Sequence, residues 1–332
     1  MPKQLDFLAI GDITTDAFIR LKDAEVHCDV NHDTCKICMD FATKIPYEFV
    51  KVVPAVGNSP NAAVCAARLG LKSGLVTNVG DDQNGKDCLA RLGNEAVATD
   101  YVKAHIGKST NYHYVLWYED ERTILIKHES FEYSLPSIGK PKWIYLSSLG
   151  QASLAFHNEI SEYLSEKPDV LLAFQPGTFQ INFGYEKLRD IYNQTKVFFS
   201  NIAEAQKILE TEEGNVQKLL LMMKERGPEI VVITDGKKGA YMNDGKNTYF
   251  MPTYPDEKPP YERTGAGDAF SSTFVSALAL GKTPLEALLW GPVNSMSVVQ
   301  YIGAQEGLLS REKLEKYLKT APENYRPQKL NN

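Results

Sequence analysis

Short runs of apolar and β-branched residues alternate with longer amphipathic segments along most of the chain. The apolar runs predict buried strands at Phe7–Ile10, Leu75–Val79, Trp143–Leu146, Val170–Phe174, Val197–Phe199 and Ile230–Thr234. The amphipathic segments predict helices at Pro60–Leu69, Gly85–Leu92, Leu154–Ser165, Ile202–Leu209, Val216–Arg226, Ala269–Ala279, Pro284–Val299 and Arg311–Lys319. Because this alternation is typical of a parallel sheet covered by helices, we expect an α/β fold with a mostly parallel central sheet.

Two segments interrupt the alternation. Residues 13–54 hold polar and β-like pieces without a long helical pattern, while Tyr112–Trp117 and Thr123–His128 read as two strands joined by an acidic turn. We expect these pieces to form a small β-sheet lid over the end of the main sheet where ligands bind, outside the carboxyl ends of the strands. The predicted core comprises residues 1–12, 55–105 and 135–332, and the predicted lid comprises residues 13–54 and 106–134.

Composition and charge exclude several classes of protein. The chain has 332 residues, of which 42 are acidic and 36 basic, so its net charge of −6 gives no support to a nucleic-acid partner. No apolar run approaches the roughly 18 residues of a membrane helix, and the first residues do not read as a secretory signal. Five cysteines without the density of a disulfide scaffold suggest a reducing compartment. We therefore expect a cytoplasmic protein, with residues 321–332 as a loose tail.

The motif Arg263-Thr-Gly-Ala-Gly-Asp-Ala-Phe270 lies directly before an apolar helical pattern. Gly265 and Gly267 permit a tight backbone whose N–H groups converge at the start of that helix, which makes a site for anionic oxygens. Asp268 follows in the first turn, where a carboxylate can take a proton from a hydroxyl that attacks phosphorus. The combination favours phosphoryl transfer to an alcohol. Spacing alone leaves open a plain helix start, with Gly for packing and Asp for the helix dipole.

Five segments, in this order, resemble those of the ribokinase-like sugar kinases, also called PfkB carbohydrate kinases. They are residues 55–70, 79–85, 201–204, 234–240 and 263–270. The resemblance spans the chain from Gly11 to about Leu309. It implies a Rossmann-like three-layer core of the ribokinase-like kind with a small β-sheet lid. It also implies an ATP-dependent kinase that transfers the γ-phosphate to a hydroxyl of a small sugar or sugar derivative.

The resemblance also assigns roles to individual residues. It implies Asp268 as catalytic base and the backbone of Gly265, Ala266 and Gly267 as the anion hole. The implied substrate ligands are Asp16, Gly57, Asn58 and Asn61, and the implied nucleotide ligands are Asn201, Thr234, Gly236, Gly239 and Asn294. Glu204 is implied to hold Mg²⁺ through water, beside ATP. From the residues alone, Asn61 reads as an ordinary helix-start residue, and Asn201 and Glu204 as a capping box, a role that can coexist with the functional one.

The chain departs from the family pattern at several positions. Val56-Gly57 stands where two glycines are usual, and Ser147–Gln151 lacks an acidic residue that some sugar-specific members have. Glu262 replaces the usual Asp that helps to hold a monovalent cation, which leaves activation by K⁺ open. The acceptor is therefore either a sugar or, on the same scaffold, a nucleoside. A noncatalytic sugar or nucleotide sensor is the third alternative.

The sequence also excludes one enzyme class. A dehydrogenase is excluded because Gly11–Asp16 lacks the Gly-x-Gly-x-x-Gly turn that a dinucleotide pyrophosphate needs. An exposed edge of the lid would allow two copies of the chain to pair as a homodimer. The expected partners are otherwise a small sugar or nucleoside and ATP, with no nucleic acid and no membrane.

A cluster of cysteine and histidine residues falls within residues 27–38: His27, Cys28, His32, Cys35 and Cys38. The spacing Cys35-x-x-Cys38 is typical of a zinc knuckle, although a second well-formed pair is missing. We favour a reduced polar loop, with structural zinc at Cys28, Cys35 and Cys38 as the alternative and a disulfide as the least favoured state. Elsewhere, Cys65 and Cys88 are expected in the core, and His113 and His128 on the lid hairpin near the substrate.

Overall fold

The computed structural model describes residues 4–29, 35–119 and 121–330. Within them, ten strands form one sheet in the order β16-β15-β14-β13-β12-β11-β10-β1-β6-β7. The parallel strands are β1 (Phe7–Ile10), β6 (Ser73–Gly80), β7 (Val102–His105), β10 (Trp143–Leu146), β11 (Leu171–Phe174), β12 (Thr195–Asn201) and β13 (Ile230–Thr234). An antiparallel edge follows with β14 (Ala240–Asn243), β15 (Thr248–Met251) and β16 (Gln328–Leu330). The predicted mostly parallel sheet is confirmed.

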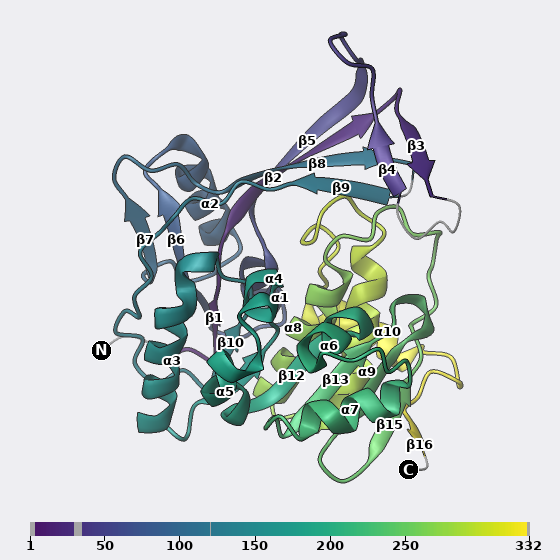
Figure 1. The fold of residues 1–332 in the computed structure, drawn as a ribbon. Helices are drawn as coiled ribbons and strands as arrows, with labels where there is room; N and C mark the ends of the chain where they lie inside the picture. Colours follow the sequence, from purple (N-terminus) through teal and green to yellow (C-terminus); the bar gives the residue numbers. More distant parts are fainter. Residues whose placement is uncertain (1–3, 30–34, 120, 331–332) are drawn as a thin grey trace.

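Helices cover both faces of this sheet, so the core has three layers (Figure 1). One face packs against α1 (Asn58–Arg68), α2 (Gln83–Asn94), α8 (Ala266–Ala279), α9 (Pro284–Val298) and α10 (Arg311–Lys319). The other packs against α3 (Leu154–Glu166), α4 (Thr178–Phe183), α5 (Tyr185–Asn193), α6 (Ile202–Leu209) and α7 (Val216–Lys224). Successive side chains of β1 alternate between the two hydrophobic clusters, as a strand buried on both faces requires. Among the described residues, no helix is long and apolar enough to cross a membrane.

A second sheet of four strands crosses over one end of the core (Figure 1). Its order is β5-β2-β8-β9, formed by β2 (Thr14–Leu21), β5 (Tyr47–Val56), β8 (Tyr112–Tyr118) and β9 (Glu121–Leu125). We call it the lid sheet. Its presence confirms the β-layer expected from the sequence, although β9 ends before His128 and leaves that residue in the following loop. The domain boundaries and the pairing of two lids into a homodimer stay predictions.

The C-terminal segment is more ordered than the predicted loose tail. β16 pairs antiparallel with β15 and extends the large sheet at its edge. The buried Tyr325 donates a hydrogen bond from its hydroxyl to the carbonyl oxygen of Leu289 at 2.5 Å. The prediction is wrong here because a three-residue edge strand with exposed side chains carries no hydrophobic pattern to mark it.

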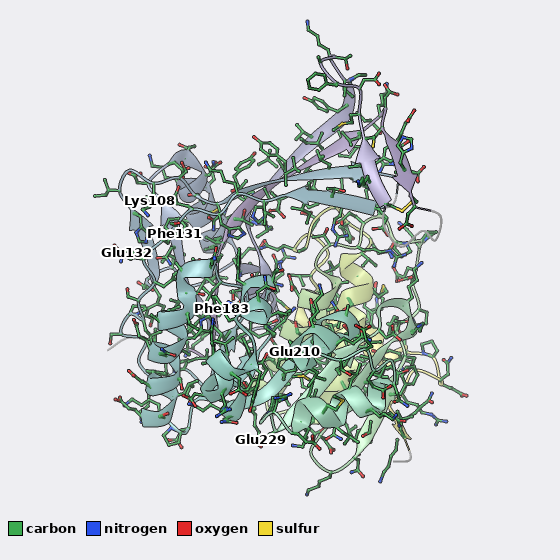
Figure 2. The ribbon with its side chains drawn as sticks, viewed as in Figure 1. Lys108, Phe131, Glu132, Phe183, Glu210 and Glu229 are labelled. Carbon is green, nitrogen blue, oxygen red and sulfur yellow. A yellow bond between two sulfur atoms is a disulfide. The ribbon has the colours of Figure 1, made fainter. Side chains whose placement is uncertain are left out.

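The cysteine and histidine cluster forms a small separate hairpin of β3 (Glu25–Cys28) and β4 (Cys35–Cys38). Cys28 and Cys35 lie directly opposite each other and are joined by a disulfide, the yellow bond beside β3 and β4 in Figure 2. The predicted reduced loop is therefore wrong. Two of the three proposed zinc ligands are used by this bond, and the described residues hold no group of three or more candidate metal ligands. His32 lies outside the described residues.

The disulfide predicts how many cysteines can be alkylated before and after reduction. Cys38, Cys65 and Cys88 are free in the structure, the last two fully buried as expected for core residues. Alkylation with iodoacetamide in denaturant without reductant should add three labels, and prior reduction should raise the number to five, as counted by intact mass. Five labels without reductant would show that Cys28 and Cys35 are thiols in the purified protein.

Candidate active site

The candidate site lies where the strand order of the large sheet reverses. β1 continues to β6 on one side, whereas β10 begins the other half of the sheet. At this reversal the backbone N–H of Asp12 donates to the carbonyl oxygen of Ser148 at 2.8 Å, so the two chain segments stay together as they leave the sheet. Ligands of open α/β sheets bind in the crevice outside such a point. Two of the predicted residues, Asn201 and Thr234, are the last residues of the neighbouring strands β12 and β13 and lie side by side at this edge.

Asp268 lies in the first turn of α8 and faces side-chain amides from distant parts of the chain. Asn58 Nδ2 donates to Asp268 Oδ1 at 2.7 Å, and Asn61 Nδ2 donates to Oδ2 at 2.9 Å. Gln175 Nε2 donates to Oδ1 at 3.2 Å. Asn58 and Asn61 come from the first turn of α1, and Gln175 directly follows β11. The structure thus brings together three residues predicted for the site, together with one that the sequence pattern does not single out.

The orientation of the Gln175 amide is fixed by its oxygen. Ser271 Oγ donates to Gln175 Oε1 at 2.8 Å, and the hydroxyl of Tyr145 also donates to this oxygen. Because two hydroxyls face Oε1, the NH₂ group must face Asp268. Tyr145 and Ser271 are buried, so the amide has little freedom to flip. Gln175 directly follows a predicted strand, and this position at the strand's carboxyl end is the feature of the sequence that could have marked it as a candidate site residue.

Burial decides the ionisation of Asp268. Removal from water raises the pKa of its carboxyl above the ordinary value, while the hydrogen bonds from Asn61, Asn58 and Gln175 act in the opposite direction. A carboxylate held by neutral amides at a raised pKa is a stronger proton acceptor than a solvated Asp. The environment of Asp268 therefore fits a general base.

The Gly265–Gly267 backbone forms the N-terminus of α8. Gly265 is its N-cap with φ of 80°, a left-handed conformation that glycine adopts without cost. A Cβ at this position would lie 2.3 Å from Cβ of Ala304, so the loop also needs the missing side chain for close packing. The first N–H groups of a helix have no internal partner and attract anions. The predicted anion hole has the required backbone.

A cavity of about 410 Å³ opens directly from this helix terminus. Its lining includes Ala266 and Gly267 together with the predicted nucleotide residues Thr234, Gly236 and Gly239. Lys237 and Arg263 bring positive charge and Asp256 one negative charge, and the apolar part of the lining comprises Tyr254, Phe270, Pro292, Met296 and Val299. Positive charge with free N–H groups suits a polyphosphate, and the apolar part of the lining suits a flat heterocycle.

Asn201 and Glu204 form a reciprocal capping box at the start of α6. Asn201 Oδ1 accepts from the Glu204 N–H, and Glu204 Oε2 accepts from the Asn201 N–H, both at 2.9 Å. Burial raises the pKa of the Glu204 carboxyl, and the charge of Asp268 acts in the same direction. Because two carboxylates repel each other here, a divalent cation between them would be favoured. The capping role is observed, and the site also fits Mg²⁺ held through water.

Asn294 does not lie where the predicted nucleotide role needs it. Its side chain is fully buried, and Nδ2 donates to Thr273 Oγ1 at 2.8 Å. Its Oδ1 accepts from the Leu309 N–H at 2.9 Å. The amide is thus used inside the core, whereas its neighbours Ser295 and Met296 reach the cavity. We therefore correct the prediction, since a buried position on an apolar helix gives an amide a structural role.

Glu262 is buried, and nearby groups compensate the charge of its carboxylate. Its Oε1 accepts from the Thr264 N–H at 2.7 Å, and its Oε2 from the Gly303 N–H at 3.3 Å. Arg122 of β9 places Nη1 3.4 Å from Glu262 Oε1. A guanidinium from the lid sheet thus supplies the positive charge that a monovalent cation would otherwise bring. The structure gives no support to the K⁺ site considered from the sequence.

Asp16 and Gly57 lie on the lid side of the site. Gly57, with φ of 120°, is the N-cap of α1, and a Cβ there would approach the Asp12 carbonyl oxygen to 2.8 Å. Asp16 of β2 lies opposite His113 of β8, with 3.3 Å between Asp16 Oδ1 and His113 Nδ1. Asp16 therefore faces a histidine of the lid sheet, a partner that the sequence placed only loosely near the substrate.

Comparisons with known proteins identify the family and the fold. The family described as pfkB family carbohydrate kinase matches residues 51–311. The chain is 28% identical over 270 residues to the ribokinase of Bacillus subtilis, covering 79% of this chain and 87% of that protein. It is 27% identical over 266 residues to the ATP-dependent 6-phosphofructokinase of Thermoanaerobacterium thermosaccharolyticum, covering 75% and 80%. A solved Arabidopsis thaliana ribokinase, complexed with ribose and ATP, superimposes with a TM-score of 0.79 at 19% identity, over 95% of this chain and 99% of that one. The expected ribokinase-like fold is confirmed.

Proposed function

The chain belongs to the pfkB family of carbohydrate kinases and is a phosphotransferase with an alcohol group as acceptor; we propose that it transfers the γ-phosphate of ATP to a hydroxyl of a small sugar or sugar derivative. The observation that carries this proposal is the position of Asp268. Its carboxylate is buried in the first turn of α8, next to the helix terminus that lines the cavity. A base and an anion site in contact are what phosphoryl transfer to an alcohol needs.

The proposed reaction uses these groups in sequence. The acceptor hydroxyl hydrogen-bonds to Asp268, which takes its proton as the oxygen attacks the γ-phosphorus. The bond from the γ-phosphorus to the oxygen that bridges the β- and γ-phosphates breaks, and ADP leaves with that oxygen. The N–H groups of Gly265, Ala266 and Gly267 then face the negative charge that develops on the transferred group. Asn58 and Asn61 keep the carboxylate oriented, and Asp16 and Gly57 contact the acceptor away from the reacting hydroxyl.

The cation that such kinases use fits beside Glu204. Glu204 would hold Mg²⁺ through water, with Asn201 holding the carboxylate in place by its backbone N–H. When bound, the cation neutralises charge on the phosphate oxygens. Few protein ligands are needed, because phosphates and water complete the coordination of Mg²⁺ in sites of this type.

The lid sheet contacts the segment that leads into the anion hole. Trp117 of β8 packs edge-on against Tyr261, with 5.1 Å between the ring centroids, and Arg122 pairs with the adjacent Glu262. We infer that the lid sheet closes over the acceptor through these contacts. Closure excludes water, which would otherwise compete with the acceptor for the γ-phosphate.

An ADP-release assay tests the proposed function. MgATP is supplied with ribose, fructose, 2-keto-3-deoxygluconate, phosphorylated sugars, inosine, cytidine or adenosine. Release that depends on one sugar supports the proposal, whereas release that depends only on a nucleoside favours the nucleoside alternative. ATP binding without release across the panel would contradict the kinase proposal and favour a sensor.

Gln175 gives a test of the base through pH. In Gln175→Glu, a carboxylate replaces the amide that lies 3.2 Å from Asp268 Oδ1, and like charges raise the pKa of Asp268. The base acts deprotonated, so activity is lost as pH falls through its pKa, and a raised pKa moves this acidic limb of kcat/KM to higher pH. We expect a movement of about one pH unit or more.

The matched control is Gln175→Leu, which removes the donor without adding a charge. We expect a smaller upward movement of the same limb, because only one hydrogen bond to the anion is lost. An acidic limb that stays at the wild-type pH in Gln175→Glu would show that Asp268 is not the titrating base.

A further inference from the structure

Two carboxylates and two imidazoles meet where the lid sheet joins the core. We call Asp12, Asp16, His113 and His128 the histidine cluster. His113 Nδ1 lies 3.3 Å from Asp16 Oδ1, and His128 Nδ1 lies 3.9 Å from Asp12 Oδ2. The two imidazole centroids are 5.2 Å apart. The kinase mechanism proposed above uses only Asp16 of these residues.

Several polar atoms of this cluster are buried without a hydrogen bond. Asp16 Oδ1, His113 Nε2 and His128 Nδ1 have no hydrogen bond to any described residue. Burying an unpaired polar atom is costly, so buried groups of native proteins are almost always hydrogen-bonded. Three such atoms in one cluster indicate a place where a ligand supplies the missing hydrogen bonds.

The surrounding fold holds these side chains in place. Asn111 Nδ2 donates to the Ile13 carbonyl oxygen at 3.0 Å, and Asn111 Oδ1 accepts from the Glu129 N–H at 2.8 Å. One buried amide therefore ties the start of β2 to the segment that carries His128. The hydroxyl of Tyr133 lies 3.0 Å from both carboxylate oxygens of Asp12 and anchors that side chain.

The histidine cluster adjoins the proposed reaction centre. The Asp12 carbonyl oxygen closely approaches Gly57, the N-cap of α1. The first turn of α1 carries Asn58 and Asn61, both hydrogen-bonded to Asp268. An acceptor with one hydroxyl at Asp268 therefore extends past Gly57 toward the two histidines.

The cluster offers hydrogen bonds without an ion-paired lysine or arginine among the described residues. Burial lowers the pKa of His128, and the charge of His113 acts in the same direction. Burial raises the pKa of Asp12 to about 7, against the hydrogen bond from Tyr133. A carboxylate or phosphate placed here would lose its water and meet Asp16 without a compensating cation.

We propose that His113 and His128, together with Asp16, form a specificity subsite that binds neighbouring hydroxyls of an uncharged polyol and rejects acceptors that carry a carboxylate or phosphate at that end. The inference rests on the proposed kinase function. An imidazole offers N–H donors and, when unprotonated, an acceptor nitrogen, and a carboxylate accepts, so together these groups match hydroxyls, which do both.

The test compares matched acceptors with and without charge. Fructose is set against fructose 6-phosphate, glucitol against gluconate, and ribose and adenosine are added as uncharged probes. The variants are His113→Ala and His128→Ala. Rescue variants are His113→Gln, whose amide reaches the Nε2 position, and His128→Asn, whose amide reaches the Nδ1 position. The control is His157→Gln, which alters another buried imidazole with an unpaired Nε2, on α3.

In each pair of matched acceptors, we expect the uncharged acceptor to have a higher kcat/KM than the charged one. Each alanine variant should raise its KM about tenfold, the effect of one buried hydrogen bond, with kcat within about threefold of wild type. The rescue variants should restore most of the loss, and His157→Gln should leave KM unchanged. A charged member with the higher kcat/KM, or an unchanged KM in both alanine variants, would overturn the subsite.

Failure of the kinase function gives a different result. If no member is phosphorylated, the proposed function fails, and calorimetric binding of the same probes decides the subsite separately. Binding of an uncharged probe that weakens about tenfold in both alanine variants would support the subsite. Equal binding in wild type and both variants, or no binding of any uncharged probe, would overturn it.

Discussion

Asp268→Asn should reduce kcat by about 10²–10⁴-fold, the range expected when a general base is removed. The substitution keeps the size of the side chain and removes only its ability to accept a proton. Asp268 is the base in the proposed reaction because its carboxyl is buried, which raises its pKa. Hydrogen bonds from Asn58, Asn61 and Gln175 hold the carboxylate in place. Single-turnover kinetics with MgATP and the preferred acceptor measure the chemical step directly.

The control for Asp268→Asn is nucleotide binding. The cavity residues Thr234, Gly236 and Gly239 are untouched, so the Kd for ATP should stay within about threefold of wild type. An amide at position 268 faces other amide donors, so we also expect a stability loss of about 1–2 kcal/mol. Turnover near the wild-type rate in a folded variant would remove Asp268 as base.

Gly265→Ala should reduce kcat by about 10²–10³-fold, because it displaces the donors of the anion hole. The residue has φ of 80°, where alanine is strained, and the added Cβ would lie 2.3 Å from Cβ of Ala304. The loop must therefore move, and its N–H groups move with it. We expect kcat to fall more than ATP affinity, since the transition state carries the charge that these groups stabilise.

A matched variant at the other end of the same helix separates strain from function. Gly281 follows α8 with φ of 83°, and a Cβ there meets nothing within 4 Å. Gly281→Ala should cost about 1–2 kcal/mol of stability, as left-handed backbone does for alanine, and leave kcat unchanged. Equal losses of kcat in both variants would show that the Gly265 effect is general destabilisation.

The large sheet was predictable wherever strands are buried on both faces. Phe7–Ile10, Trp143–Leu146 and Ile230–Thr234 have the predicted bounds, because burial on both faces demands a continuous apolar run. Edge strands were not predictable in this way. β7 and β16 contain no fully buried side chain, so hydrogen bonding to a neighbour rather than hydrophobicity defines them.

The candidate site was only partly predictable. Asp268, Asn58 and Asn61 stand beside glycine-rich or helix-start motifs and are placed together in the structure. Gln175 is 93 positions from Asp268, and nothing local to it reveals the contact. Asn294 is polar, as a nucleotide ligand would be. The sequence does not show that its side-chain amide forms hydrogen bonds with Thr273 and Leu309 inside the core.

The cysteines show the same limit from another direction. The two-residue gap between Cys35 and Cys38 suggested metal, whereas the pairing that forms joins Cys28 to Cys35. The register of β3 and β4, which places these two residues opposite each other, is a property of the folded hairpin. Spacing along the chain does not encode it.

The central claim is that the chain moves phosphate from ATP to an acceptor alcohol with Asp268 as base. The most direct measurement follows the γ-phosphate itself, with ³²P-labelled ATP and mass spectrometry of the product, in wild type and Asp268→Asn. The account predicts labelled product that forms only when both ATP and an acceptor alcohol are present, and loss of that product in the variant. Label released only as inorganic phosphate, or equal transfer by both proteins, would contradict it.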